Sequence, residues 1–319
     1  MKILMISAVL GLAVLAGQAQ AQGKFPEKPV TLIVPYAPGG TTDLLGRQLA
    51  AELADIWGQP VVVENRSGAG SMIGTAHLAQ SKPDGYTLLL NTPAHVTAPA
   101  VYDDLPFDPA TDITSVAMLS YSPFLMVAGS SVSADTLEEL VEEARSGEMF
   151  IATSGLGSSS HFAGELFASE SGSSIDIVHF NGGGEALSSL MGAHAELYIS
   201  SAASSMAAVS GGQVKPIAVL GSERYSKLPD TQATSEAGIE IPDIRIWQGI
   251  FGPGGMPDDL VQKIAADVET VLESEEFLAM LDSNYTMPAN VSSAEFSKMV
   301  ADEMIFWKEL AQRRGIKRE

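Results

Sequence analysis

Short apolar, β-branched runs alternate with helical patterns along most of this chain, and this alternation most constrains the fold. Strands and helices that alternate in this way form largely parallel sheets with helices packed on their faces. We therefore predict an α/β fold. The predicted strands are Thr31–Val34, Val61–Glu64, Thr87–Leu90, Val116–Leu119, Phe124–Ala128, Phe150–Ala152, Ile175–His179, Leu197–Ile199, Pro216–Leu220 and Trp247–Phe251.

Helical patterns fill the intervals between these runs, and from Pro257 onward the chain has helical character alone. The last pattern is amphipathic, as expected of a helix that packs on a core. The predicted helices are Asp43–Ala54, Thr75–Gln80, Leu137–Ala144, His161–Ser169, Glu185–Met191, Ala202–Ser210, Pro257–Glu273, Glu275–Leu281 and Ala294–Arg313.

The chain contains no glycine- or serine-rich linker that would divide it into consecutive halves. The segments Leu119–Pro123 and Leu220–Arg224 instead have the character of two crossings between lobes. We predict a discontinuous first lobe, residues 22–121 and 222–319, with a second lobe, residues 122–221, inserted into it. In such an arrangement a ligand binds in the cleft between the lobes.

The N-terminus predicts export. Lys2 precedes an almost wholly apolar run, and Ala19-Gln20-Ala21 has the small-x-small form of a cleavage site. We predict a signal peptide at residues 1–21 and a periplasmic protein that begins at Gln22. The apolar run is shorter than the ~20 residues that span a bilayer. The chain has no cysteine, so we expect neither disulfides nor lipid attachment at a cysteine.

Charge excludes two classes of partner. The chain has 39 Asp and Glu residues against 18 Lys and Arg, a formal net charge of −21. Such a surface repels nucleic acid and anionic lipid. The same field opposes an anionic ligand at long range, so local dipoles would have to hold one.

Residues 33–43 carry a glycine-rich turn between a strand and a helix. Gly39 and Gly40 can expose backbone N–H groups, and Thr41 or Thr42 is a candidate N-cap. The amides of a helix N-terminus attract an anion. The alternative is an ordinary strand-to-helix connection. Asp43 in the first helical turn is better explained as a carboxylate that caps its own helix.

A second glycine-rich turn, Ser154–His161, repeats this arrangement after the strand Phe150–Ala152. Its alternative is a serine-rich helix cap and nothing more. With one turn in each lobe, a carboxylate could bridge them. We hypothesise that the turns at Gly39–Thr41 and Gly157–Ser159 hold the ligand.

Weaker donor candidates lie elsewhere. Asn91–His95 follows a strand and would form a third wall of the cleft. His95 and His161 could donate to a carboxylate, although a lone histidine is more often structural. Ser200, which closes the strand Leu197–Ile199, is a further candidate.

Enzyme motifs are missing from the sequence. The glycines of Gly68–Gly74 do not fit the G-x-G-x-x-G spacing, and G-x-S-x-G, P-loop and H-E-x-x-H motifs are absent. Adjacent Ser160 and His161 do not converge as a hydrolytic pair. We predict no catalytic residues, no metal site and no cofactor.

Phe25–Val30 leading into Val34–Asp43 resembles the start of mature Bug-family proteins, the extracytoplasmic receptors of tripartite tricarboxylate transporters. The similarity spans nearly all of the mature chain. It continues through Val63–Arg66, Gly68–Gly70, Pro83–Leu88, Ser154–His161, Leu228–Asp230, Glu236–Gly238, Trp247 and Gly252–Pro253.

The resemblance implies a two-lobed periplasmic binding protein fold of type II. Such a receptor captures a small organic carboxylate, here a dicarboxylate or an aromatic carboxylate, and delivers it to the large and small membrane subunits of a secondary transporter. We expect a monomer. In this family backbone amides, hydroxyls and ordered water hold the ligand, which implies as site residues Tyr36, Pro38, Gly39, Gly40, Thr41, Asp43, Asn91, Thr92, His95, Ser154, Gly157, Ser158, Ser159 and His161.

One departure bears on the ligand. Relatives usually read Val-Pro-Tyr-Lys-Gly where this chain has Val178–Gly182, which includes Phe180. A phenolic hydroxyl and a charge are lost, and Phe180 could pack on an apolar or aromatic ligand body. Heavily charged, citrate-like ligands are therefore less expected.

Two other functions remain open at this point. A sensor subunit that feeds a signalling kinase would use the same pocket. A periplasmic hydrolase or isomerase would need a convergent nucleophile and base, which the sequence does not offer.

Overall fold

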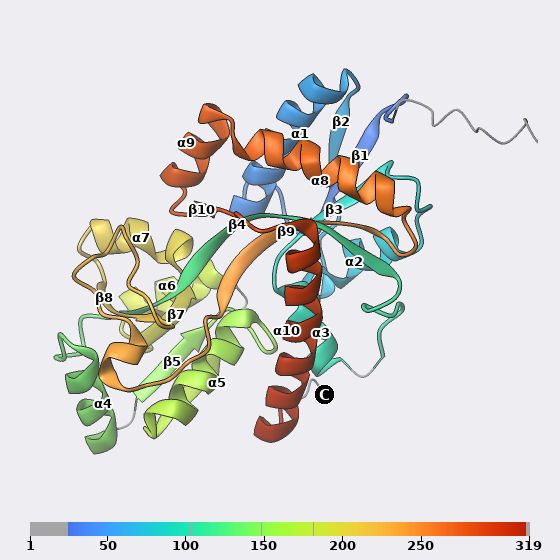
Figure 1. Cartoon of the computed structure of the whole chain (residues 1–319). Helices are drawn as coiled ribbons and strands as arrows, with labels where there is room; N and C mark the ends of the chain where they lie inside the picture. The colour runs from blue at the N-terminus through green and yellow to red at the C-terminus, as the bar shows by residue number, and fades with distance from the viewer. Residues whose placement is uncertain (1–24, 103, 148, 181, 317–319) are drawn as a thin grey trace, which may run out of the picture.

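The computed structural model describes residues 25–316, apart from residues 103, 148 and 181. The predicted signal peptide and the predicted mature start at Gln22 lie outside the described residues. The fold is mixed α/β, as predicted. Its strands form one curled sheet whose two halves meet on β4 (Figure 1). We call the half that contains the first strands the first lobe and the other half the second lobe.

The sheet of the first lobe has the strand order β2-β1-β3-β9-β4. β1 runs parallel to β2 and β3, and β9 is antiparallel to both β3 and β4. A short strand, β10, adds to β4. The strands are β1 (Val30–Val34), β2 (Val61–Asn65), β3 (Thr87–Asn91), β4 (Ile113–Ala128), β9 (Arg245–Pro253) and β10 (Met287–Pro288).

The sheet of the second lobe repeats that order. β5 runs parallel to β6 and β7, and the end of β4 is antiparallel to both β7 and β8. Each lobe therefore has three parallel strands, followed by an antiparallel strand that connects it to the other lobe (β9 in the first lobe, β4 in the second). A final strand pairs with that one (β4 in the first lobe, β8 in the second). The strands are β5 (Met149–Thr153), β6 (Ile175–His179), β7 (Leu197–Ser201) and β8 (Lys215–Leu220).

Helices connect the parallel strands and cover the sheets (Figure 1). Two of them begin at capping boxes, formed by Thr136 with Glu139 and by Ser292 with Glu295. The helices are α1 (Thr41–Trp57), α2 (Met72–Ala79), α3 (Ala94–Val101), α4 (Leu137–Ser146), α5 (Ser159–Ser171), α6 (Gly183–Met191), α7 (Ala202–Ser210), α8 (Asp258–Leu272), α9 (Glu275–Ser283) and α10 (Ser293–Arg314), with 3₁₀ turns η1 (Ala69–Ser71) and η2 (Thr234–Ala237).

The chain crosses to the second lobe along β4. This is one continuous strand of 16 residues, so the prediction of two separate strands, Val116–Leu119 and Phe124–Ala128, is wrong. Pairing with β9 ends at Pro123, and pairing with β7 and β8 begins at Phe124. The missing N–H of proline is tolerated because it falls where β4 changes partners.

The chain returns to the first lobe along β9. Before that, residues 221–244 contact the second lobe. Val219 N of β8 donates to Gln232 O at 2.9 Å, and Gln232 Nε2 donates to Glu138 of α4 at 3.0 Å. These contacts extend past the predicted crossing at Leu220–Arg224. The predicted division into residues 22–121 with 222–319 and 122–221 stays a prediction.

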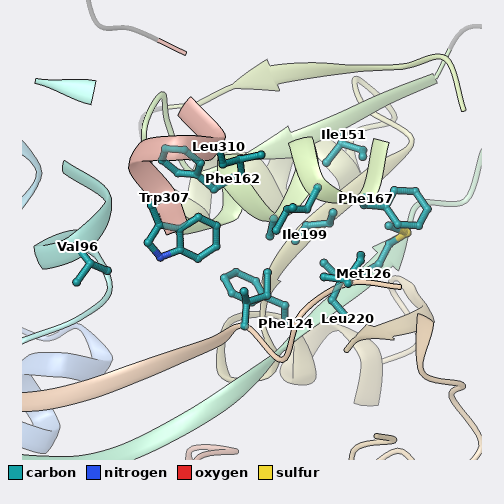
Figure 2. Close-up of a cluster of buried hydrophobic side chains, with 14 of the residues drawn as sticks. Val96, Phe124, Met126, Ile151, Phe162, Phe167, Ile199, Leu220, Trp307 and Leu310 are labelled. Carbon is teal, nitrogen blue, oxygen red and sulfur yellow. The ribbon is translucent and has the colours of Figure 1, made fainter. Parts of the chain in front are cut away.

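An apolar cluster joins the two lobes along α10 (Figure 2). Trp307 of α10 packs on Phe162 of α5 with ring centroids 5.2 Å apart, and Val96 of α3 belongs to the same cluster. At the end of α10, Arg314 Nε donates to Glu165 Oε2 of α5 at 2.7 Å. The C-terminal helix therefore packs on both lobes. None of the described helices combines the length and the apolar character that crossing a bilayer requires.

Candidate functional site

A cavity of about 540 Å³ lies between the lobes, at the carboxyl ends of their parallel strands. Ligands of open α/β sheets bind at such strand ends. A second cavity of similar volume lies beside Phe25 and Tyr86. It is lined by residues of the first lobe alone. The residues around the cavity are Tyr36, Gly40, Thr41, Thr42, Thr92, Ser122, Ser154, Ser159, Ser160, Gly183, Gly184, Leu187, Tyr198, Ser200, Ser201, Ala203, Ser204, Ile246 and Gln248.

Four helix N-termini meet at this cavity, which is lined by the first residues of α1, α5, α6 and α7. The N-terminus of a helix carries partial positive charge and unpaired N–H groups. Ser158 and Ser201 cap α5 and α7 by accepting from backbone N–H groups. Gly40 and Gly182, which precede α1 and α6, provide no side-chain cap. The first amides of α1 and α6 are therefore the better placed to bind an anion.

No lysine, arginine, histidine, aspartate or glutamate is among the described residues that line the cavity. Its polar groups are hydroxyls, amides and backbone. Burial raises the pKa of both Tyr36 and Tyr198 to about 12, so both phenols stay neutral. The described residues also include no group of three or more His, Asp or Glu arranged to hold a metal.

The floor of the cavity comes from the two crossing strands. Ser122 of β4 and Ile246 and Gln248 of β9 line it. Ser120 Oγ lies 2.7 Å from Gln248 Oε1 and donates to it, which leaves the Gln248 amide nitrogen available as a donor. Leu187 and Ile246 add apolar surface for a ligand body.

Seven of the sixteen predicted site residues line this cavity: Tyr36, Gly40, Thr41, Thr92, Ser154, Ser159 and Ser200. The other nine do not: Pro38, Gly39, Asp43, Asn91, His95, Gly157, Ser158, His161 and Phe180. Several of these nine make hydrogen bonds to the backbone of the segments that line the cavity.

Asp43 has a structural role, but it does not cap α1 as predicted, because its backbone bond goes to Gly39 in the turn before the helix. Its carboxylate is 1% exposed and accepts from Gly39 N at 2.9 Å, from Arg47 at 3.0 Å and from Asn65 Nδ2 at 2.8 Å. The Arg47 guanidinium is the main reason why the pKa of Asp43 falls to about 2. The carboxylate is thus fully occupied by its own surroundings.

His161 and Gly157 bond to each other. Gly157 N donates to His161 Nδ1 at 3.0 Å, and His161 is 3% exposed. A Cβ on Gly157 would lie 2.7 Å from Val101 Cγ2 of the first lobe, and Gly157 has a φ of +74°. Glycine is therefore required here by the approach of the two lobes.

Asn91 and His95 are buried beneath the cavity wall. Asn91 Oδ1 accepts from Tyr36 Oη at 3.1 Å and from Thr92 N at 2.9 Å, so Asn91 orients two residues that do line the cavity. The His95 ring packs against Phe251 at a tilt of 41°, with ring centroids 4.5 Å apart. Burial lowers the pKa of His95 to about 4, which keeps the ring neutral.

Phe180 is half-buried against a separate apolar cluster in the second lobe, which includes Leu190, Tyr198 and Met206. Apolar surface in the cavity comes instead from Leu187, Ile246 and Tyr198. Sequence reasoning missed these residues and also the start of α6. The glycines at 182–184 after β6 carry the same signal as the two predicted turns and could have indicated it.

Comparison with known proteins agrees with this geometry. A family model described as the tripartite tricarboxylate transporter family receptor matches residues 45–316. Protein BugT of Bordetella pertussis is 30% identical over 297 residues, covering 92% of this chain and 91% of BugT.

Two solved structures are similar over nearly the whole chain. An R. palustris protein solved with adipate has a TM-score of 0.81 and 31% identity, covering 92% of this chain and 99% of that one. MatC from Rhodopseudomonas palustris, solved with bound malate, has a TM-score of 0.78 and 29% identity, covering 90% of this chain and 99% of MatC. The two-lobed periplasmic binding protein fold is therefore confirmed, and the chain belongs to the tripartite tricarboxylate transporter receptor family.

Proposed function

We propose that this protein is a periplasmic solute-binding receptor. It captures a small organic carboxylate between its lobes and delivers it to the membrane subunits of a tripartite tricarboxylate-type transporter. The observation that carries this proposal is the convergence of four helix N-termini on a cavity whose described lining has no charged side chain. Such a site neutralises an anion with peptide dipoles and hydroxyls.

The proposed ligand class is a dicarboxylate, with an aromatic carboxylate as the second candidate. Relatives with about the same fold were solved with adipate and malate. Hydrogen bonds to an anion contribute about 1.5–3 kcal/mol each, so several of them supply the roughly 8 kcal/mol of micromolar binding after the cost of association. Leu187 and Ile246 could contact the carbon chain of the ligand.

The proposal excludes an enzyme and assigns no cofactor. This fits the described lining of the cavity, which includes no histidine, lysine, aspartate or glutamate that could act as a general base. We further propose that the protein acts as a monomer. A sensor of a signalling kinase stays the alternative, because it would bind the same ligand in the same cavity.

Ligand screening tests the proposal directly. The mature protein is heated with adipate, malate, citrate, benzoate and a neutral diamide of adipate as control. A ligand at 100 times its Kd should add about 2.7 kcal/mol of stability, a clear rise in Tm. A panel in which no carboxylate raises Tm would contradict the proposal. Loss of uptake of the bound carboxylate in cells that lack the protein separates transport from sensing.

Gly40→Val tests the anion site itself. Gly40 has a φ of −79°, and the nearest atom to a Cβ there is Ala37 O at 3.8 Å. The fold should accept valine, while its branched side chain covers the first amides of α1. We expect at least a tenfold loss of adipate affinity by calorimetry, about 1.4 kcal/mol. Gly147→Val, at the end of α4 with a φ of −145°, is the matched control and should bind normally.

A further inference from the structure

We propose that Asp43 and His161 are a matched pair of positioning residues. Each accepts a hydrogen bond from the glycine four residues earlier and so holds the turn that presents one wall of the cavity. Neither residue lines the cavity itself. The consequence for affinity rests on the proposed carboxylate function, whereas the consequence for the turns does not.

The first turn is closed at both ends. Gly39 N donates to Asp43 Oδ2 at 2.9 Å, and Asn65 Nδ2 donates both to Asp43 Oδ1 at 2.8 Å and to Tyr36 O at 3.1 Å. Arg47 donates to both Asp43 oxygens at 3.0 Å. These bonds fix the backbone from Tyr36 to Gly39, and the next residues, Gly40 to Thr42, line the cavity.

The second turn is closed by an imidazole. Gly157 N donates to His161 Nδ1 at 3.0 Å. A neutral imidazole that accepts at Nδ1 carries its proton on Nε2, and His161 Nε2 lies 3.6 Å from Glu165 Oε1. Glu165 is held in turn by Arg314. Ser159 and Ser160, which follow the turn, line the cavity.

The two arrangements share their spacing although their chemistry differs. Glycine, acceptor and the partner of the acceptor lie at residues 39, 43 and 47 in the first lobe and at 157, 161 and 165 in the second. In each set the glycine lies in the connection from a parallel strand to the following helix, β1 to α1 and β5 to α5, and the other two residues lie in the first two turns of that helix. A carboxylate and an imidazole nitrogen thus perform the same task.

The first test needs no ligand. His161→Asn keeps an acceptor near the position of Nδ1, His161→Gln places its oxygen near Nε2, and His161→Leu has none. By NMR hydrogen exchange, we expect the Gly157 amide to exchange about tenfold faster in the leucine variant and close to the parent rate in the asparagine variant. Asp43→Leu should do the same to the Gly39 amide.

The ring itself gives a spectroscopic check. The imidazole nitrogens of His161 should show the proton on Nε2 in the parent protein. A proton on Nδ1, or equal Gly157 exchange in the asparagine and glutamine variants, would overturn the assignment. That comparison still decides the matter if the leucine variant does not fold.

The second test measures adipate binding by calorimetry. We expect His161→Leu and Asp43→Leu to bind about tenfold more weakly, and His161→Asn to bind nearly as the parent, because turns that are not held in place lose preorganisation.

Glu295→Ala removes a capping box at the start of α10, away from the cavity, and should lower stability without lowering affinity. Leucine variants with parent-like affinity and exchange would refute the pairing. If the parent binds no carboxylate, the proposed function fails, while the exchange result still decides this inference.

Discussion

Glu303 of α10 accepts hydrogen bonds from the indole N–H groups of Trp247, at 3.2 Å, and of Trp307, at 3.3 Å. Burial raises the pKa of this carboxyl to about 7, from an ordinary value of 4.5. The folded protein therefore binds this proton more tightly than the unfolded chain does. By linkage, the stability contributed by Glu303 is fully present below pH 4.5, falls as pH rises to about 7, and stays low above it.

Replacing Glu303 by Gln should remove that loss. At pH 8 we expect the variant to be more stable than the parent by up to about 3 kcal/mol, whereas at pH 4.5 the two should differ little. Urea unfolding at both pH values measures the difference. Glu309→Gln, an exposed change on the same helix, is the control. If the difference in free energy of unfolding between variant and parent does not increase with pH, the role assigned to burial is wrong.

At the scale of elements, α1 must lie close to the sheet for its N-terminus to reach the cavity. Gly46 allows this approach, because a Cβ there would lie 2.9 Å from Val34 Cγ2 and 3.3 Å from Leu90 Cδ2. We expect Gly46→Ala to cost about 1–3 kcal/mol through overpacking, since the stiff valine side chain cannot move aside. Gly184→Ala in α6, where a Cβ meets nothing within 4 Å, should instead stabilise by up to about 1 kcal/mol through helix propensity. Thermal unfolding of both variants tests this, because Tm should fall for Gly46→Ala and rise for Gly184→Ala.

Local sequence patterns predicted most helices and strands. They did not predict the helix α3 or the residues on the floor of the cavity. Ile175–His179 and Ala202–Ser210 were predicted with their observed bounds, because strand and helix periodicities differ clearly there. α3 was missed, because Pro93 and Pro99 argue against a helix although the first precedes it and the second lies inside it.

The candidate site divides in the same way. Turns after strands could be recognised from glycine and serine, and they supplied Gly40, Thr41, Ser154 and Ser159. Gln248 and other floor residues could not, because they lie in the middle of crossing strands. Which side of such a strand meets a cavity depends on pairing between segments far apart in the chain.

At the scale of the whole molecule, β4 and β9 run between the lobes, and α10 packs on α5 across them. The approach of Val101 to Gly157 lies at the same junction. We therefore expect closure of the lobes on a ligand to bend β4 and β9. A larger side chain at Gly157 would hold the lobes apart.

This leads to a prediction about lobe movement. Because the chain has no cysteine, spin labels at Ala51→Cys on α1 and Ala207→Cys on α7 report one distance between the lobes. We expect adipate to shorten that distance in the parent, and Gly157→Ala to lengthen it without ligand and to weaken the shortening. Gly172→Ala is the matched control: it shares a positive φ, +61° against +74°, but its Cβ meets nothing within 4 Å. The backbone strain is then the same in both variants, so a control that opens as widely would mean that strain, and not contact with Val101, sets the lobe separation.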